Sequence, residues 1–482
     1  MQGNNTHKEK KVSVWLAAIP LIALVIMLAM TIKVFGADAI AGGSQISLLV
    51  ASSVATIIAI GFCGCRWSDL EHAIAENIHT SASAIIILLL IGAISSSWML
   101  SGVVPTLIYY GLQIIHPKVF LLVACLICAF VSVLTGSSWT TIATIGVALM
   151  GIGTAQGFSE GWIAGAIISG AYFGDKVSAL SDTTVLAAST ARVPLFEHIK
   201  YMMITTVPSL IIALVVFFVV GIQNSADSTE QITLISNALQ STFNITPWLL
   251  LVPVITMLLV VRKLPALITL FVSVVIACIA LVAAQSNILS EIGGGSDFMS
   301  SFKGIIDICT TSTKIKSGEA IVDELIATRG MAGMLDTIWL ILCAMCFGGV
   351  MSGSGMLGAI TQLFLRFVHR TVSIVASTIC SGIFFNMCTA DQYISIIITG
   401  STFRKLYAER GLEARLLSRS VEDSATVTSV LIPWGSCGMT QSTVLGVSTI
   451  TYLPYCIFNI ASPIISILVA AIGYKIIHKA EK

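Results

Sequence analysis

The sequence has few charged residues for its length. Its 482 residues include 25 Lys and Arg and 24 Asp and Glu, which make up 10% of the chain and leave a formal net charge of +1. A soluble domain contains about a quarter charged residues. The shortage therefore excludes an ordinary soluble enzyme. Because neither sign is in excess, a nucleic-acid partner is excluded as well.

The sequence also lacks the motifs of several classes of membrane enzyme. It has no glycine-rich phosphate-binding loop of the Walker type and no H-E-x-x-H pair, which argues against an ATP-driven pump and a zinc protease. None of its seven histidines lies at the centre of an apolar run. Most of the twelve cysteines do lie in such runs, where free cysteine packs as a small hydrophobic residue. We therefore expect no enzymatic activity and no cofactor.

Apolar residues are abundant, at 56% of the chain, and the mean hydropathy is +0.96. They form blocks of about 20 residues, the length of a helix that crosses a lipid bilayer. We expect an all-α polytopic membrane protein with about 11–13 transmembrane segments. The distribution of Lys and Arg between the blocks predicts that both termini lie in the cytoplasm.

Two parts of the chain resemble each other in the order of their features, at an offset of about 250 residues. Residues 64–222 and 331–475 each contain a Ser-Gly break, a polar turn, an acidic segment and a proline-containing helix. The basic residues place the starts of the two parts on opposite sides of the membrane, which is typical of inverted-topology repeats with broken helices or re-entrant hairpins. The rest is interpreted as N-terminal transmembrane helices (1–63), linking transmembrane helices (245–285) and an extramembrane loop (286–330).

The densest polar segment within an apolar run extends from Ser169 to Thr184. An ionisable group inside a membrane helix is costly, so its presence indicates a transport pathway or a binding site. Asp175 and Asp182 are seven positions apart and share one face if the helix continues between them. Their oxygens suit a hard cation such as sodium, and the same carboxylates can bind a proton instead.

The alternative for this segment is a structural role. Asp175 and Lys176 can form an ion pair at a helix end, while Ser181 and Asp182 cap the next helix. We expect Lys176 to pair with one of the two aspartates, which leaves the other free to titrate.

Acidic residues also interrupt apolar runs in the second half of the chain. Asp391 follows Asn386 in a polar break where a hairpin tip would reach the middle of the membrane; the alternative is a surface loop. Its counterpart in the first half, residues 135–140, is rich in hydroxyl groups and has no charge. Glu422 and Asp423 precede another broken run. One of them is expected to cap a helix, and Asp423 is the preferred functional residue.

Four segments together form a more specific set of motifs. They are residues 170–176 (GAYFGDK), 180–184 (LSDTT), 418–424 (SRSVEDS) and 431–434 (LIPW). Together with residues 135–139 and 391–393, they closely resemble the NhaC type of sodium/proton antiporters. The chain departs from that pattern at Ala179, Val185, Val430 and Gly435, where the family usually has proline, asparagine, proline and asparagine. These losses beside the expected site bear on the bound solute more than on the fold.

The resemblance implies a secondary transporter of the bacterial cytoplasmic membrane that exchanges sodium for protons by alternating access. The alternative function is sodium-coupled exchange or uptake of a small organic anion of the malate and lactate type, or of an amino acid. Sodium and protons would be transported substrates, and a homodimer is an assembly that the sequence allows. The residues expected to bind the ion or substrate are Asp175, Ser178, Asp182, Thr183, Ser137, Ser138, Thr140, Asn386, Thr389, Asp391 and Asp423, of which Asp175, Asp182 and Asp391 are the expected sodium ligands.

Overall fold

The structure is a computed structural model that describes residues 12–35, 42–223, 229–262, 264–366 and 370–476. Within these ranges the regular elements are helices, and the only strand-like feature is a single bridge between residues 313 and 328. Nine of the described helices are long and apolar enough to span a membrane, or up to eleven if each of two sharply bent pairs counts as one span. The all-α polytopic fold is confirmed, and the upper count reaches the lower end of the expected range.

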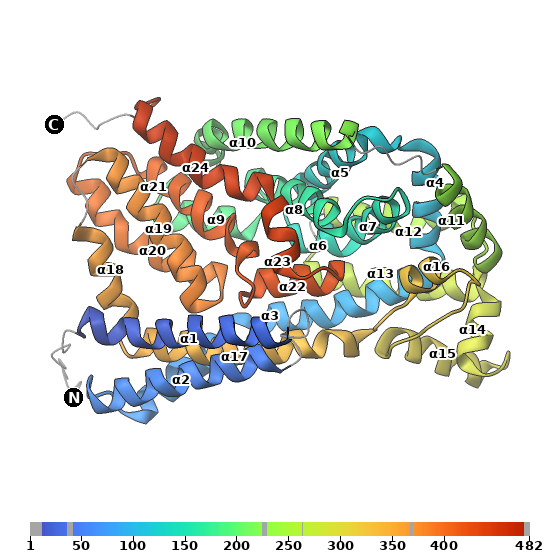
Figure 1. The fold of residues 1–482 in the computed structure, drawn as a ribbon, viewed down its shortest axis with the longest axis horizontal. Coiled ribbons are helices and arrows are strands. Elements are labelled where there is room, and N and C mark those ends of the chain that lie inside the picture. The colour runs from blue at the N-terminus through green and yellow to red at the C-terminus, as the bar shows by residue number, and fades with distance from the viewer. Residues whose placement is uncertain (1–11, 36–41, 224–228, 263, 367–369, 477–482) are drawn as a thin grey trace.

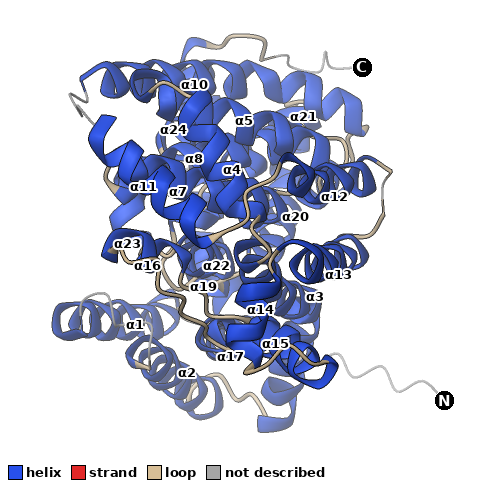
Figure 2. Cartoon of the chain, turned by 90° about the vertical axis from the view of Figure 1, so that its right-hand side faces the viewer, coloured by secondary structure: helices blue, strands red, loops and turns tan. Residues whose placement is uncertain are grey.

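Three long helices, two from near the N-terminus and one from the second half of the chain, lie together along one side of the molecule (Figure 1), and Figure 2 shows them at the opposite end from α10. They are α1 (Val14–Phe35), α2 (Gly43–Gly61) and α17 (Leu335–Gly353), and α3 (Trp67–Leu100) packs against α17. Their small and apolar side chains, such as Ala55 and Phe347, share one buried core. On the opposite side α10 (Leu195–Gln223) packs against α24 (Ile457–Ile472).

The remaining helices lie between and beside these two groups (Figure 1). They are α4 (Val103–Ile114), α5 (Phe120–Thr135), α6 (Ser138–Thr141), α7 (Val147–Ala155), α8 (Glu160–Val177), α9 (Asp182–Ala191), α11 (Thr229–Thr242), α12 (Leu251–Val261), α13 (Ala266–Ala284), α14 (Ser286–Gly293), α15 (Phe298–Thr310), α16 (Ala320–Ile326), α18 (Met356–Arg366), α19 (Thr371–Thr389), α20 (Gln392–Glu409), α21 (Ala414–Val421), α22 (Ser436–Leu445) and α23 (Thr449–Tyr452). A π-helical turn, η6 (Glu422–Thr426), continues α21.

The structure bears on two expectations. Asp175 and Asp182 would share one helical face only if the helix continued between them, and the chain is interrupted there between α8 and α9. The two residues therefore do not lie on one continuous helix. The segment 286–330, expected as an extramembrane loop, contains the three helices α14, α15 and α16.

Helix boundaries recur in the two halves with a constant spacing. Helices α9 and α22 start at residues 182 and 436 and end at 191 and 445, so both pairs are 254 positions apart. Each helix is followed by a residue in the left-handed conformation, Arg192 with φ 59° and Gly446 with φ 71°. The same local structure at the same spacing is what an internal repeat predicts. The opposite orientation of the two halves stays a prediction.

Helix α8 lies unusually close to α5. A Cβ atom at Gly170 would overlap the backbone oxygen of Cys125, and one at Gly174 would overlap that of Ala129. Small residues are what allow two helix backbones to approach so closely in a membrane protein. The contact fixes the end of α8, which contains Asp175, against the helix that leads into residues 135–140.

We expect Gly170→Ala to destabilise the protein by about 1–3 kcal/mol, because the added methyl group overpacks a backbone contact that cannot yield easily. Gly358→Ala is the matched control, because Gly358 is also helical and has nothing within 4 Å of its would-be Cβ atom. Thermal unfolding of the purified protein in detergent measures both. A midpoint for Gly170→Ala that equals the Gly358→Ala value would contradict the close packing of α5 and α8.

Candidate functional site

Two helical hairpins have tips with matching geometry. After α5, Gly136 is left-handed with φ 66°, and after α19 Ala390 is left-handed with φ 55°. The next residue caps the second helix of each hairpin. Ser137 accepts a hydrogen bond from the Thr140 amide at 3.2 Å, and Asp391 accepts from the amides of residues 393 and 394 at 2.9 and 3.0 Å. The first tip is therefore neutral, and the second carries a carboxylate, as the sequence predicts.

The first hairpin contacts the helix break after α8. Asp175 is only 5% exposed, and its Oδ2 accepts hydrogen bonds from the amide and the hydroxyl group of Ser138, at 3.2 and 2.7 Å. In the break itself, Ser178 donates to the backbone oxygen of Val133 at 2.8 Å. Thr184 closes the break from the far side by donating to the carbonyl of Lys176 at 3.0 Å.

The second half repeats this contact with different side chains. Ser429 donates to Gln392 Oε1 at 3.2 Å. Ser429 lies 254 positions after Asp175, and Gln392 lies 254 positions after Ser138. The same two positions thus touch in both halves. Only the first pair contains an acid, so the two halves provide one charged and one neutral contact between a hairpin and a helix break.

A buried ion pair connects the two halves. Lys176 at the end of α8 pairs with Asp423 of η6, and both side chains are fully buried. Ser462 of α24 lies 2.9 Å from both partners, and Thr205 of α10 donates to the same Asp423 oxygen at 3.1 Å. The expectation that Lys176 pairs with Asp175 or Asp182 is wrong, because its partner is 247 positions away in the sequence. Because Lys176 pairs with Asp423, Asp175 forms no salt bridge with a described residue.

Neither Glu422 nor Asp423 caps the N-terminus of a helix, which corrects a second expectation. Both lie in η6, the direct continuation of α21, whose N-terminal cap is Glu413. Ser181, in contrast, does cap α9 by accepting a hydrogen bond from the Thr184 amide at 3.4 Å. The structural alternative therefore holds for Ser181.

The other predicted residues lie around the same two breaks. Asp182 starts α9 and is exposed, whereas Asp391 is 6% exposed, which rules out the surface-loop alternative for Asp391. Asp175, Asp182 and Asp391 all act electrostatically on the Tyr393 phenol, so the three carboxylates converge on one region. The hydroxyl and amide groups are already engaged in local hydrogen bonds. These are Thr183 with Ser181 (2.9 Å), Thr140 with Ser137 (3.2 Å), Thr389 with the Asp391 carbonyl (3.0 Å) and Asn386 with the Ala425 carbonyl (2.7 Å).

In the described part of the chain, no three His, Cys, Asp or Glu side chains gather closely enough to hold a metal ion by themselves. A cation near Asp175 would therefore take most of its ligands from hydroxyl and carbonyl oxygens. Such ligands suit a weakly held hard cation that must also leave.

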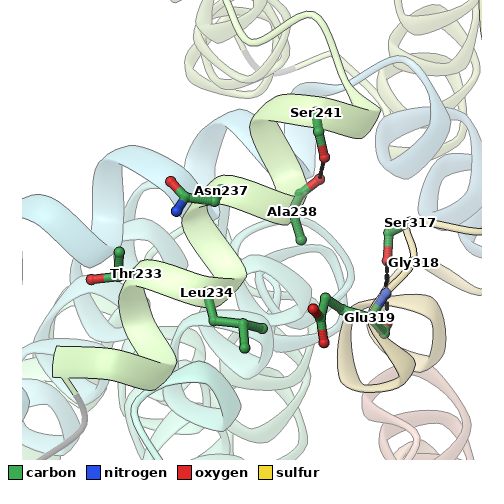
Figure 3. Close-up of a pocket in the computed structure, with 8 residues that line it drawn as sticks. All are labelled: Thr233, Leu234, Asn237, Ala238, Ser241, Ser317, Gly318 and Glu319. Atoms are coloured by element: carbon green, nitrogen blue, oxygen red, sulfur yellow. Dashed lines mark hydrogen bonds between the residues drawn. The ribbon is translucent and has the colours of Figure 1, made fainter.

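Two cavities differ in their relation to this site. A small polar pocket beside Asp391, between Asn386 and Ser436, has no room for a water molecule. A larger cavity of about 910 Å³ opens between α11 and residues 317–319 (Figure 3). Its serines are engaged locally: Ser241 donates to the Ala238 carbonyl and Ser317 to Asp323. The large cavity contains none of the predicted site residues.

The model of the Na+/H+ antiporter family matches residues 170–474 of this sequence. The chain belongs to this family. It is 37% identical to the Na(+)/H(+) antiporter NhaC of Bacillus subtilis (strain 168), over 84% of this chain and 87% of that protein. Membership of an antiporter family indicates a transporter rather than an enzyme.

Two further relatives are named for organic substrates. The chain is 33% identical to the Malate-2H(+)/Na(+)-lactate antiporter of Bacillus subtilis (strain 168), over 85% of each protein. It is also 33% identical to the Arginine/ornithine antiporter ArcD of Halobacterium salinarum, over 98% of this chain and 94% of that protein.

The sequence did not identify three buried polar side chains of this antiporter-family chain as site residues. They are Glu422, Arg419 and His198, all fully buried. His198 lies 2.8 Å from Ser418 through Nδ1. The sequence held one indication of a buried role for Arg419: it lies one helical turn before Asp423, and this spacing predicts that the two side chains share a helix face. His198 gave no signal, because it lies near the start of an apolar run.

The Asp391 side chain both caps a helix and carries a negative charge, and two substitutions distinguish these two contributions to stability. We expect Asp391→Asn to retain the stability of the native protein, because Asn caps a helix about as well as Asp. Asp391→Ala should cost about 0.5–2 kcal/mol, because the amides of residues 393 and 394 lose their acceptor. Thermal unfolding in detergent measures the difference. Equal losses in the two variants would contradict the capping role.

Proposed function

We propose that this chain exchanges sodium for protons across a membrane by alternating access. The observation that supports this most is the buried carboxylate of Asp175, which forms no salt bridge with any described residue and lies where a hairpin tip meets a helix break. A carboxylate in that position attracts a cation, because the surrounding apolar region makes an uncompensated charge costly. Sodium and a proton can both supply the missing charge. The name of the NhaC relative agrees with this exchange.

Sodium is proposed to bind at Asp175, with further oxygens from the two hairpin tips. A hydroxyl group that donates its proton elsewhere keeps its lone pairs for a cation. Ser178 is such a group, because it donates to the Val133 carbonyl; its oxygen accepts from the Leu180 amide at 3.2 Å, which leaves one lone pair. Ser137, Ser138 and Asp391 would add ligands from the tips, and the list is completed by Thr140, Thr183, Asn386 and Thr389 from the same region. The exposed Asp182 would attract cations toward the site, and Asp423 would hold Lys176.

The repeated boundaries support the alternating-access part of the proposal. In secondary transporters, two repeats of opposite orientation form one site at their interface and open it to either side in turn. Residues 64–222 and 331–475 are proposed to be those repeats. The positions of the basic residues support an orientation with both termini on the cytoplasmic side. The similarity to a bacterial antiporter supports a bacterial cytoplasmic membrane.

Sodium-coupled transport of an organic anion or amino acid is the second candidate function. The names of two relatives favour it, as does a buried amide in the second half. Gln441 of α22 is fully buried, and neither of its side-chain atoms has a hydrogen-bond partner among the described residues. An unpartnered buried amide is costly, and a polar solute would satisfy it.

We expect the purified protein in proteoliposomes to move protons out of the vesicles when sodium, but not potassium, is added to the outside. Asp175→Asn should reduce this flux at least about 100-fold while leaving membrane insertion unchanged, because it removes the ionisable group and little else. Asp336→Asn is the matched control, because Asp336 is an exposed aspartate at the start of α17. A pH-sensitive dye inside the vesicles records the flux.

Wild-type flux in Asp175→Asn would remove Asp175 from the mechanism. Absence of sodium-dependent flux in active wild-type vesicles would contradict sodium/proton exchange itself. Malate, lactate, arginine and ornithine are then added in turn at fixed sodium. Stimulation of sodium uptake by one of them would establish the second function.

A further inference from the structure

The second half of the chain contains buried charges that the repeat does not explain. The positions 254 residues before Arg419, Glu422 and Asp423 are occupied by Gly165, Ile168 and Ser169. The first half forms a helix at the equivalent positions without any charge there, so helix formation does not require these charges. The charges of the second half require another reason.

Glu422 is the least satisfied of these side chains. It is fully buried, and neither carboxylate oxygen has a hydrogen-bond partner among the described residues. The Thr426 hydroxyl, one turn further along η6, and the three guanidinium nitrogens of Arg419 have none either. Leaving buried polar groups unpaired costs free energy, and in native proteins it usually marks a functional site or a place for water.

The charged groups around Glu422 come from few elements. Lys176 and Asp175 of α8 and Asp423 of η6 act on it electrostatically. Helices α19 and α24 also pack against η6 and contain no charged residue. The charged residues of α9 and α20, which pack there as well, are exposed: Asp182, Arg404, Lys405 and Glu409. Helix α21, which continues into η6, contributes Arg419 and the more exposed Arg415. His198 of α10 experiences the charges of Lys176 and Asp423 as well.

These groups leave one negative charge uncompensated. We call Asp175, Lys176, Arg419, Glu422 and Asp423 the buried charge cluster; all five are at most 5% exposed. With every member ionised, three carboxylates face two cations. A net charge in a low-dielectric interior is costly, so the cluster favours the uptake of one cation. A sodium ion beside Asp175 or a proton on Glu422 would each make it neutral, and both together would make it positive.

A row of polar side chains leads from the surface to this cluster along α10 and α21. At the outer end, the side chain of Arg415 is 24% exposed. The guanidinium groups of Arg415 and Arg419 both lie over the Tyr201 ring, at 4.9 and 5.0 Å from its centre. At the inner end Thr205 donates to Asp423. The contact between Asp175 and Ser138 involves none of these residues, so protons and sodium need not share one entry.

We propose that Glu422 is the group that carries the transported proton, and that it is coupled to sodium at Asp175 through the charge of the cluster. This inference rests on the sodium/proton exchange proposed above. A proton from water adds to a Glu422 oxygen and neutralises its carboxylate; the cluster then releases sodium. Sodium binding at Asp175 reverses this step and returns the proton to water. The two ions compete for one charge deficit while occupying different residues.

The test is the dependence of sodium affinity on pH, measured on the purified full-length protein. In the wild type the apparent dissociation constant for sodium should rise by up to about tenfold for each unit that the pH falls, the limit for one ion displacing one proton. Glu422→Gln imitates the protonated form. Its sodium affinity should be constant, within about twofold, at the weak value that the wild type shows at low pH.

Three further variants make the result specific. Glu160→Gln, the same substitution at an exposed position at the start of α8, should retain the wild-type pH dependence. His198→Gln should also retain it, which separates Glu422 from the neighbouring imidazole. Glu422→Asp keeps a carboxyl group and should retain a pH dependence with a shifted midpoint. If Glu422→Gln fails to fold, Glu422→Asp provides the test in its place, because loss of the pH dependence in Glu422→Asp would overturn the proposal.

Other outcomes have equally definite meanings. An unchanged pH dependence in Glu422→Gln would overturn the role of Glu422 while leaving sodium/proton exchange intact. Loss of all sodium binding in Glu422→Gln would make Glu422 a sodium ligand and also overturn the proposal. Absence of sodium binding in the wild type would instead contradict the proposed function on which the inference rests.

Discussion

The cost of an uncompensated charge in the apolar interior of a membrane is the constraint on which the arrangement of this protein depends. Ionisable groups are scarce in the chain, and two of the buried ones, Lys176 and Asp423, are paired although they lie 247 positions apart in the sequence. The Lys176–Asp423 pair joins the two halves and is enclosed by hydroxyl groups from two further helices. Each buried charge needs such partners, because burial without them costs several kcal/mol. The one charge left without compensation then becomes the driving force for binding a cation.

The backbone provides the precise placement that such a site needs. Gly170 and Gly174 bring α8 against α5, and the left-handed residues Gly136 and Ala390 turn the two hairpins at the same point. The caps that begin the second helix of each hairpin use a serine in one half and an aspartate in the other. Identical backbone geometry with different side chains gives a framework with one neutral and one acidic tip. That asymmetry suits a site that must distinguish its two sides.

The sequence predicted well whatever depends on local composition. Apolar blocks predicted the helices, and the polar turns at 135–140 and after Asn386 predicted the hairpin tips and the burial of Asp391. Long-range pairing was not predictable from one sequence. Nothing local to Lys176 indicates that its partner is Asp423 rather than Asp175. The sequence left open whether the helix continues past Lys176, because the break after α8 contains neither proline nor glycine and is closed by Thr184. The capping role expected for Glu422 or Asp423 failed because α21 begins earlier, at Ala414.

The account makes sodium binding and proton release two aspects of one event, since a single charge deficit controls both. The most direct test is the number of protons released when sodium binds to the wild-type protein in a weakly buffered detergent solution, followed with a pH-sensitive dye. At a pH where the protein is mostly protonated, the account predicts a release that approaches about one proton per bound sodium ion. Saturable sodium binding without release of protons at any pH would contradict it.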